Sequence, residues 1–121
     1  MELETLRHYL QSQPGATEEI PFGPEALVFK VAGRMFALLA WESAPLRLTL
    51  KCDPDHARVL RDLYPAVQPG YYMNKRHWNT ITLDGSLSDE ELRQLSDDSY
   101  ALVVKGLTRA ARQQLEAGVA P

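Results

Sequence analysis

The residues best suited to chemistry lie together at positions 74–79, which read NKRHWN. Lysine and arginine neutralise phosphates, asparagine and histidine can reach sugars and base edges, and a tryptophan ring can stack on a base. A polar loop before a strand is also a common structural feature, so this cluster alone has low specificity. It is the stretch in which we expect a functional site.

Catalytic chemistry has weaker support. As a general base, His77 would need a pocket and a partner, and a hydrogen-bonded structural histidine is the commoner case. Cys52, the single cysteine, ends an apolar strand pattern, which is typical of a small buried hydrophobe, and the sequence shows no His/Cys pair. His8 and His56 lie on predicted helices without matching ligands, so we expect no metal site. We therefore expect no enzyme and no cofactor; an enzymatic alternative would require a cleft between His77 and the loop at 17–23.

Charge is segregated along the chain, although the net charge is only -3. Residues 26–83 carry eight Lys and Arg against four acids, and acidic stretches at 1–25 and 84–98 flank them. A basic middle is compatible with nucleic-acid binding, but dedicated binders are usually more basic overall. The alternative is that these charges form ordinary solvated faces.

The size and composition of the chain fit a single domain spanning 1–121, because 121 residues that are 45% hydrophobic can bury one core. The longest nearly apolar run, 35–41, is far shorter than the roughly 20 residues of a membrane helix. The acidic, amphipathic start lacks the pattern of a secretory signal. We expect a cytoplasmic protein without a membrane partner.

Four helices are predicted from apolar spacing and capping residues. Leucines recur at helical spacing in 3–10, and Asp53 before a proline is a strong helix start. Ser88 and Glu91 form a capping box for the next helix, and a last helix begins near Thr108.

Apolar and alternating runs predict strands at 27–31, 35–41, 46–51 and 78–83, whereas prolines and glycines in 16–26 favour an ordered loop. The expected order is helix, three strands, helix, one or two strands, helix and a further C-terminal helix. Because strands follow one another instead of alternating with helices, we expect an α+β two-layer sandwich, an antiparallel sheet with helices on one face.

The alternation within the strands indicates what the uncovered face of the sheet carries. In 46–51 three leucines point one way, which turns the two cations and the threonine between them outward. The same reasoning turns Lys30 and Trp78 outward, so a stacking platform and cations would share one face. A bulge near Asn79 would reverse this and bury Trp78 as a packing residue.

Several blocks of the chain resemble, in order and spacing, those of a known family. The blocks are TEEIPFG at 17–23, VFKVAGRMFAL at 28–38, LTLKCDPDHARVLRDLYPAVQPGYYMNKRHWNTITLDG at 48–85 and SYALVVKGL at 99–107. They resemble the MmcQ/YjbR family of small bacterial proteins, labelled as predicted DNA-binding with a double-wing motif. The resemblance implies a two-layer fold similar to that of secretion chaperones, in agreement with the order above.

The resemblance also points to particular residues. Lys30 and Arg34 correspond to a pair of cations on the family's hairpin. The family's polar block falls on Asn74, Lys75, His77, Trp78 and Asn79. Relatives often have histidine where this chain has Tyr72, which weakens any shared metal or acid–base site, and lysine where it has Arg34 and Arg76, which preserves a phosphate contact.

Two functional hypotheses follow. The first is DNA binding through a basic and aromatic surface. The residues expected to form it are Lys30, Arg34, Arg47, Lys51, Asn74, Lys75, Arg76, His77, Trp78 and Asn79. The second is a chaperone-like interaction module that binds a protein partner, or a second copy of the chain, on the open sheet face, since Trp and Arg are common interface anchors.

Overall fold

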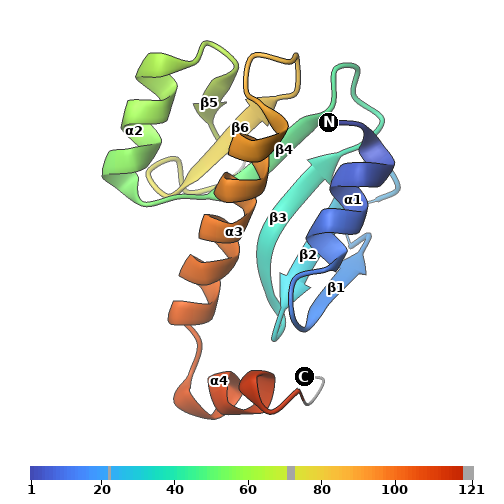
Figure 1. Cartoon of the computed structure of the whole chain (residues 1–121), viewed down its shortest axis with the longest axis vertical. Helices are drawn as coiled ribbons and strands as arrows, with labels where there is room; N and C mark the ends of the chain where they lie inside the picture. The colour runs from blue at the N-terminus through green and yellow to red at the C-terminus, as the bar shows by residue number, and fades with distance from the viewer. Residues whose placement is uncertain (22, 71–72, 119–121) are drawn as a thin grey trace.

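The computed structural model describes residues 1–21, 23–70 and 73–118, and within them the chain forms six strands and four helices (Figure 1). In chain order these are α1 (Leu3–Gln11), β1 (Ala16–Glu19), β2 (Leu27–Val31), β3 (Arg34–Ala40), β4 (Arg47–Lys51), α2 (Pro54–Leu63), β5 (Val67–Pro69), β6 (Trp78–Thr82), α3 (Asp89–Lys105) and α4 (Arg109–Glu116). No helix in this part of the chain is long and apolar enough to cross a membrane.

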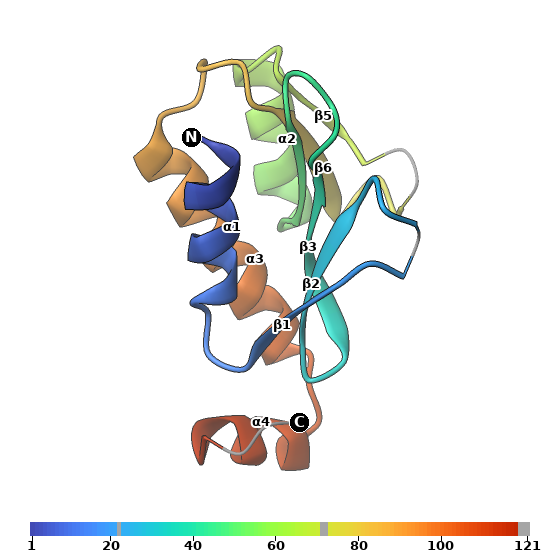
Figure 2. The same cartoon turned by 90° about the vertical axis from the view of Figure 1, so that its right-hand side faces the viewer.

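The strands form one antiparallel sheet in the order β1-β2-β3-β4-β6-β5. Helices α1, α2 and α3 lie on one side of this sheet, which is seen nearly edge-on in Figure 2, and α4 lies beyond one end. The α+β two-layer architecture is therefore confirmed. We call the side without helices the open face and the other side the covered face.

Strand β1 corrects the expectation of a loop at 16–26. Its residues pair with β2 from Ala16 opposite Val31 to Glu19 opposite Val28. The sequence hides this strand because its two covered-face positions hold only the small Ala16 and Glu18, a residue type that is usually exposed to solvent. That carboxylate accepts two hydrogen bonds from the Arg7 guanidinium on α1, at 2.6 and 2.7 Å, so a charge pair replaces the apolar contact that would have marked a strand.

The helix starts follow the local sequence. The Asp53 carboxylate accepts from the backbone N–H groups of Asp55 and His56 at 3.2 and 3.3 Å, which caps α2. Ser88 and Glu91 form the predicted capping box of α3, each side chain accepting from the other's backbone N–H. These two caps determine the residues at which α2 and α3 begin.

A β-bulge at Phe36 fixes α3 against the centre of the sheet. Phe29 pairs with Ala37 and Lys30 with Met35, which leaves Phe36 as the extra residue, fully buried in the core. At this point a side chain from α3 enters the ladder between β3 and β4. The Ser99 hydroxyl donates to the Phe36 carbonyl at 2.6 Å and accepts from the Lys51 N–H at 2.8 Å.

Candidate nucleic-acid interface

The direction of Trp78 follows from the register of β4 and β6. The two strands pair without interruption from Arg47 opposite Thr82 to Lys51 opposite Trp78. Directly opposed residues share a face, and the pair of Leu48 with Ile81 is buried in the core on the covered face. Lys51 and Trp78 therefore lie together on the open face, and the bulge near Asn79 that would have buried Trp78 does not occur.

The backbone beside Trp78 is built to fit closely against it. The N–H of Gly70, just after β5, donates to the Trp78 carbonyl at 2.9 Å. A Cβ atom at position 70 would lie only 3.0 Å from the Trp78 Cβ. Glycine at position 70 therefore allows the chain to pass close to the backbone of Trp78, whose side chain is half-buried.

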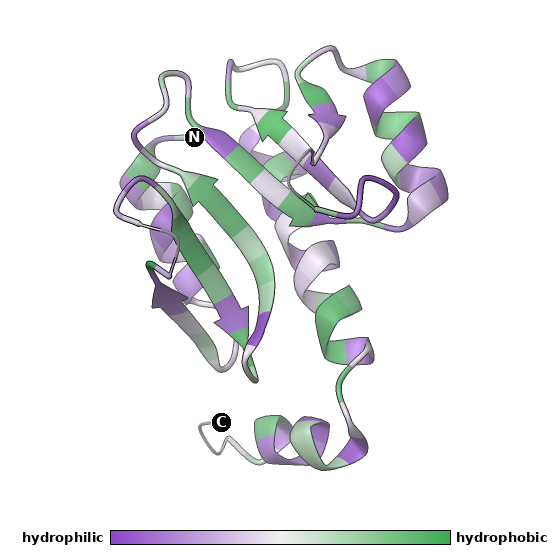
Figure 3. Ribbon diagram, turned by 180° about the vertical axis from the view of Figure 1, so that it is seen from behind, coloured by the Kyte–Doolittle hydropathy of each residue, from purple (hydrophilic) through white to green (hydrophobic). Residues whose placement is uncertain are grey.

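Residues 74–77 form a turn directly before β6, in agreement with the polar loop expected there. The Asn74 side-chain oxygen accepts from the Arg76 N–H at 3.0 Å, and its carbonyl accepts from His77 and Trp78. Asn74 thus serves the backbone of the turn, as asparagine commonly does. Lys75 and Arg76 are exposed at its tip, and the turn is hydrophilic in Figure 3, which looks onto the open face.

Arg61 of α2 supports this turn from behind. Its guanidinium donates to the Lys75 carbonyl at 2.8 Å, and the His77 carbonyl accepts from the Cys52 N–H at 2.7 Å. The turn is thus tied both to α2 and to the end of β4. Sequence reasoning missed Arg61, because a helix residue 14 positions upstream carries no local sign of contacting a loop.

These contacts gather five residues at one corner of the sheet, which we call the basic corner. Its members are Lys51, Arg61, Lys75, Arg76 and Trp78. They come from β4, α2, the turn and β6, and the pairing of Lys51 with Trp78 and the Arg61–Lys75 hydrogen bond join them.

Two other expected cations share the open face but lie outside this corner. Lys30 is opposite Met35, and its ammonium is 3.5 Å from a Glu19 carboxylate oxygen. Arg47 is exposed at the opposite end of β4, beside Thr82. The acid on Lys30 offsets its charge, so the net positive character of the open face lies toward β4 and β6.

Asn79 and Arg34 do not join the expected surface. Asn79 is only 2% exposed, pairs with Leu50 on the covered face, and donates from Nδ2 to the Ala57 carbonyl of α2 at 3.2 Å. Its side-chain oxygen has no hydrogen-bond partner among the described residues. Arg34 is paired with Val31, one residue past the outward pair of Lys30 and Met35, so it leaves the sheet on the other face. Alternation thus separates Lys30 and Arg34, which the resemblance had joined.

Two further points concern Tyr72 and the residues that could bind a metal ion. Tyr72 lies outside the described residues. Within the described residues, no group of three or more His, Cys, Asp or Glu side chains could hold a metal ion.

Comparison with known proteins gives consistent matches over most of the chain. The YjbR family model matches residues 11–102. YbdF of Escherichia coli O157:H7 is 38% identical over 98 residues, which are 81% of this chain and 80% of YbdF. YjbR of Escherichia coli K12 is 33% identical over 115 residues, which are 95% of this chain and 98% of YjbR.

Solved structures agree with these sequence matches. The crystal structure of Deinococcus radiodurans DR2400, a protein with a DUF419 domain, is similar with a TM-score of 0.88 and 44% identity, over 93% of this chain and 86% of DR2400. A Pseudomonas syringae crystal structure has a TM-score of 0.72 and 28% identity, over 84% of this chain and 98% of that one. The chain belongs to the YjbR family.

Proposed function

We propose that this protein binds nucleic acid, without enzymatic activity, through the basic corner of its open sheet face. The observation that carries the proposal is the pairing of Trp78 with Lys51 on that face, directly beside the turn that exposes Lys75 and Arg76. An aromatic side chain flanked by cations on a sheet surface is the arrangement by which many proteins hold single-stranded DNA or RNA.

The aromatic and the cationic residues of the basic corner have different roles in binding. The Trp78 ring offers a face on which a base can stack, worth roughly 1–3 kcal/mol for each stacked base. Lys51, Lys75 and Arg76 can neutralise phosphates on either side of that base, and this attraction is independent of sequence. Because the open face presents strands and turns and not a helix, a groove-reading mode that inserts a helix into duplex DNA finds no element here.

The charge of the whole molecule sets the expected strength. With a net charge of -3, long-range attraction to nucleic acid is absent, and binding depends on the few cations of the corner. If about four phosphates are contacted, log affinity falls with log salt at a slope of about -2.8 for single strands and about -3.6 for duplex DNA. We therefore expect binding that is measurable at low salt and weak at physiological salt.

The test is fluorescence anisotropy with a labelled oligothymidine and a duplex of equal length, from low to physiological salt. Trp78→Ala should weaken single-strand binding by about tenfold while leaving the salt slope unchanged, since stacking releases no counterions. Lys75→Gln with Arg76→Gln should reduce the slope by about 1.4.

Matched controls use residues away from the corner. Trp41→Phe changes the other tryptophan, whose Nε1 donates to the Pro24 carbonyl, and Arg112→Gln removes one cation from α4. Both should leave binding unchanged. The proposal fails if the wild type binds neither oligonucleotide at low salt, or if these controls lower affinity as much as the corner variants do.

A second candidate is docking of a protein segment on the other half of the open face. Met35 and Leu38 lie there on β3, and their neighbour Val28 is fully buried although it points away from the helices. Around these three residues the surface is apolar, whereas the basic corner is charged, and the Lys30–Glu19 pair lies beside it on β1 and β2. Leu38→Asp should then abolish self-association, measured by sedimentation, without changing the salt dependence of nucleic-acid binding; a monomeric wild type argues against self-association on this surface.

A further inference from the structure

Cys52 and His56 meet at the start of α2, although nothing in the sequence reading joined them. Cys52 directly precedes the capping residue Asp53, and His56 lies in the first turn of the helix. The Cys52 Sγ atom is 3.6 Å from the His56 Nδ1 atom, within the range of a hydrogen bond that involves sulfur. Only 7% of Cys52 is exposed, and an imidazole that can accept the thiol proton is in contact with its sulfur.

This pair lies at the wall of an open cleft between α2 and α3. The cleft has a volume of about 300 Å³, and Cys52, Asp53, His56, Asp98, Ala101, Leu102 and Lys105 line it. Its volume suits a small molecule, not a macromolecule. The thiol therefore has both a base beside it and a space from which a reagent can reach it.

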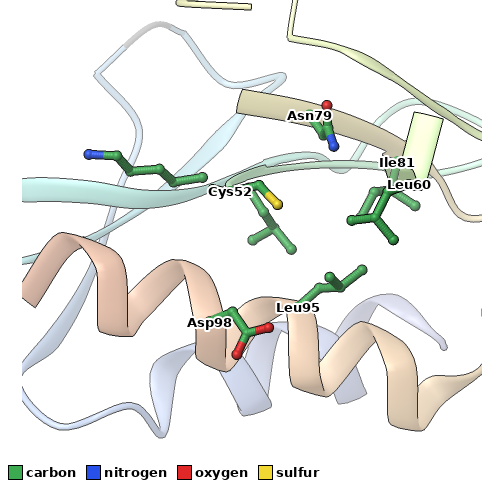
Figure 4. Close-up of a pocket in the computed structure, with 8 residues that line it drawn as sticks. Cys52, Leu60, Asn79, Ile81, Leu95 and Asp98 are labelled. Atoms are coloured by element: carbon green, nitrogen blue, oxygen red, sulfur yellow. The ribbon is translucent and has the colours of Figure 1, made fainter. Parts of the chain in front are cut away.

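A second, smaller cavity of about 10 Å³ shares Cys52 and Asp98 with the cleft among its lining residues (Figure 4). Leu60, Ile81 and Leu95 form apolar walls there, and Asn79, whose buried side-chain oxygen has no partner among the described residues, lines it too. This cavity has room for one water at most, so a reagent must reach the sulfur from the side of the larger cleft.

We propose that this cleft is a covalent modification site, at which Cys52 forms a mixed disulfide with a small cationic disulfide while His56 takes up the thiol proton. The Cys52 sulfur attacks one sulfur of the reagent, a new S–S bond forms, and the reagent's own S–S bond breaks. The proton passes from Cys52 to His56 Nδ1 and then to the departing thiolate. One disulfide and one thiol are consumed, and one mixed disulfide and one small thiol are formed.

The charges around the thiol determine which reagent is preferred. Asp53 and Asp98 face the cleft, with Lys105 the only cation among its lining residues. Burial and these two carboxylates raise the pKa of Cys52 to about 11, while Arg61 opposes them. The resting thiol is therefore protonated at neutral pH, so reaction depends on the imidazole, and an anionic reagent meets two carboxylates.

The test is the rate of mixed-disulfide formation on the folded protein, followed by intact mass at pH 8 with cystamine, a diamine disulfide. His56→Gln should slow the reaction at least tenfold, whereas His8→Gln on the exposed side of α1 should leave it unchanged. The His56 backbone N–H keeps its Asp53 cap in this variant, so α2 still starts at the same place. Cys52→Ser should form no adduct.

Charge selectivity supplies a second, independent measurement. Each reagent's rate is divided by its rate with a free small thiol, because the leaving group alone changes the rate of exchange. After this correction cystamine should react faster than dithiodipropionate, an anionic dialkyl disulfide, and Asp98→Asn should narrow that preference several-fold. The proposal is overturned if the adduct forms only after unfolding, if His56→Gln and His8→Gln react at the same rate, or if the anionic reagent has the faster corrected rate. A normal circular dichroism spectrum for each variant excludes misfolding as the cause.

Discussion

The two faces of this sheet use polar side chains in different ways. On the covered face, buried polar groups complete the backbone: the Ser99 hydroxyl joins Phe36 to Lys51, and the Asn79 amide holds the Ala57 carbonyl of α2. On the open face, Thr49 and Thr80 bond to each other through their hydroxyls at 2.8 Å. Polar residues on the covered face thus determine how helices dock, whereas those on the open face leave the helices unaffected.

The open face is not uniformly accessible either. Val28 is fully buried and Thr49 is 7% exposed, although both point away from the helices. Val28 and Thr49 are thus buried at the centre of this face, Leu38 between them is half-buried, and the exposed charged side chains lie at the margins. We therefore expect that truncating a side chain on the covered face lowers the free energy of unfolding, whereas truncating one at the margin of the open face weakens binding.

The largest difference in stability between variants of the two faces is expected at two successive residues of β3. Phe36→Ala should destabilise the protein by about 3–5 kcal/mol, because it empties a fully buried site and removes the edge-on contact with the Tyr100 ring, 5.4 Å between centroids. Met35→Ala, one residue earlier on the open face, should cost below about 1.5 kcal/mol. Urea denaturation measures both losses of stability. Equal losses would mean that side chains on the open face contribute as much to stability as those in the core.

A second test compares two buried serines of α3. Ser99→Ala leaves the Lys51 N–H and the Phe36 carbonyl without their shared partner, which should cost about 2–3 kcal/mol. Ser96→Ala removes only a hydroxyl that donates to the Leu92 carbonyl four residues back in the same helix, so about 1 kcal/mol or less is expected. If thermal unfolding shows the two variants to be alike, Ser99 does not anchor α3 to the bulge.

The sequence correctly predicted those features that depend only on residues close together in the chain. The capping box of Ser88 and Glu91 and the cap at Asp53 need only residues within one turn, and both form as expected. The alternation of β4 likewise placed Leu48 and Leu50 in the core. The fold class follows from such local signals, since the order of helices and strands leaves few arrangements of the chain.

What the sequence left undecided depends on residues far apart in the chain. Strand β1 was hidden because Glu18 is neutralised by Arg7 of another element. Asn79 was expected at the surface from the family resemblance, although the alternation that turns Trp78 outward places Asn79 on the covered face, where it pairs with Leu50. The Cys52–His56 contact was missed for a different reason: Cys52 lies before the capping residue Asp53, outside the helix in which i, i+4 spacing would have indicated a contact.

The third test uses two consecutive glutamates of β1, one on each face. Glu18 is hydrogen-bonded by Arg7, which lowers its pKa, so its stabilising effect is present above about pH 4.5 and lost as the pH falls through the lowered value. Glu18→Gln should therefore cost about 1–2 kcal/mol at pH 7 and progressively less in acid.

The matched variant is Glu19→Gln, which breaks the 3.5 Å contact with Lys30 on the open face. That pair is more exposed, so a change of about 0–0.5 kcal/mol without pH dependence is expected. Denaturation midpoints between pH 3 and pH 7 decide the matter, and a flat profile for both variants would mean that Arg7 contributes nothing to the docking of α1.

The smallest effect on stability is expected for two single-cation variants, which should differ clearly in their effect on nucleic-acid binding. Lys51→Gln and Arg34→Gln each remove one cation, from opposite faces, and each should change the free energy of unfolding by less than about 0.5 kcal/mol. Only Lys51→Gln should then weaken nucleic-acid binding, with a salt slope lower by about 0.7 for single strands. Equal losses of affinity would show that total charge, and not the position of Lys51 beside Trp78, determines binding.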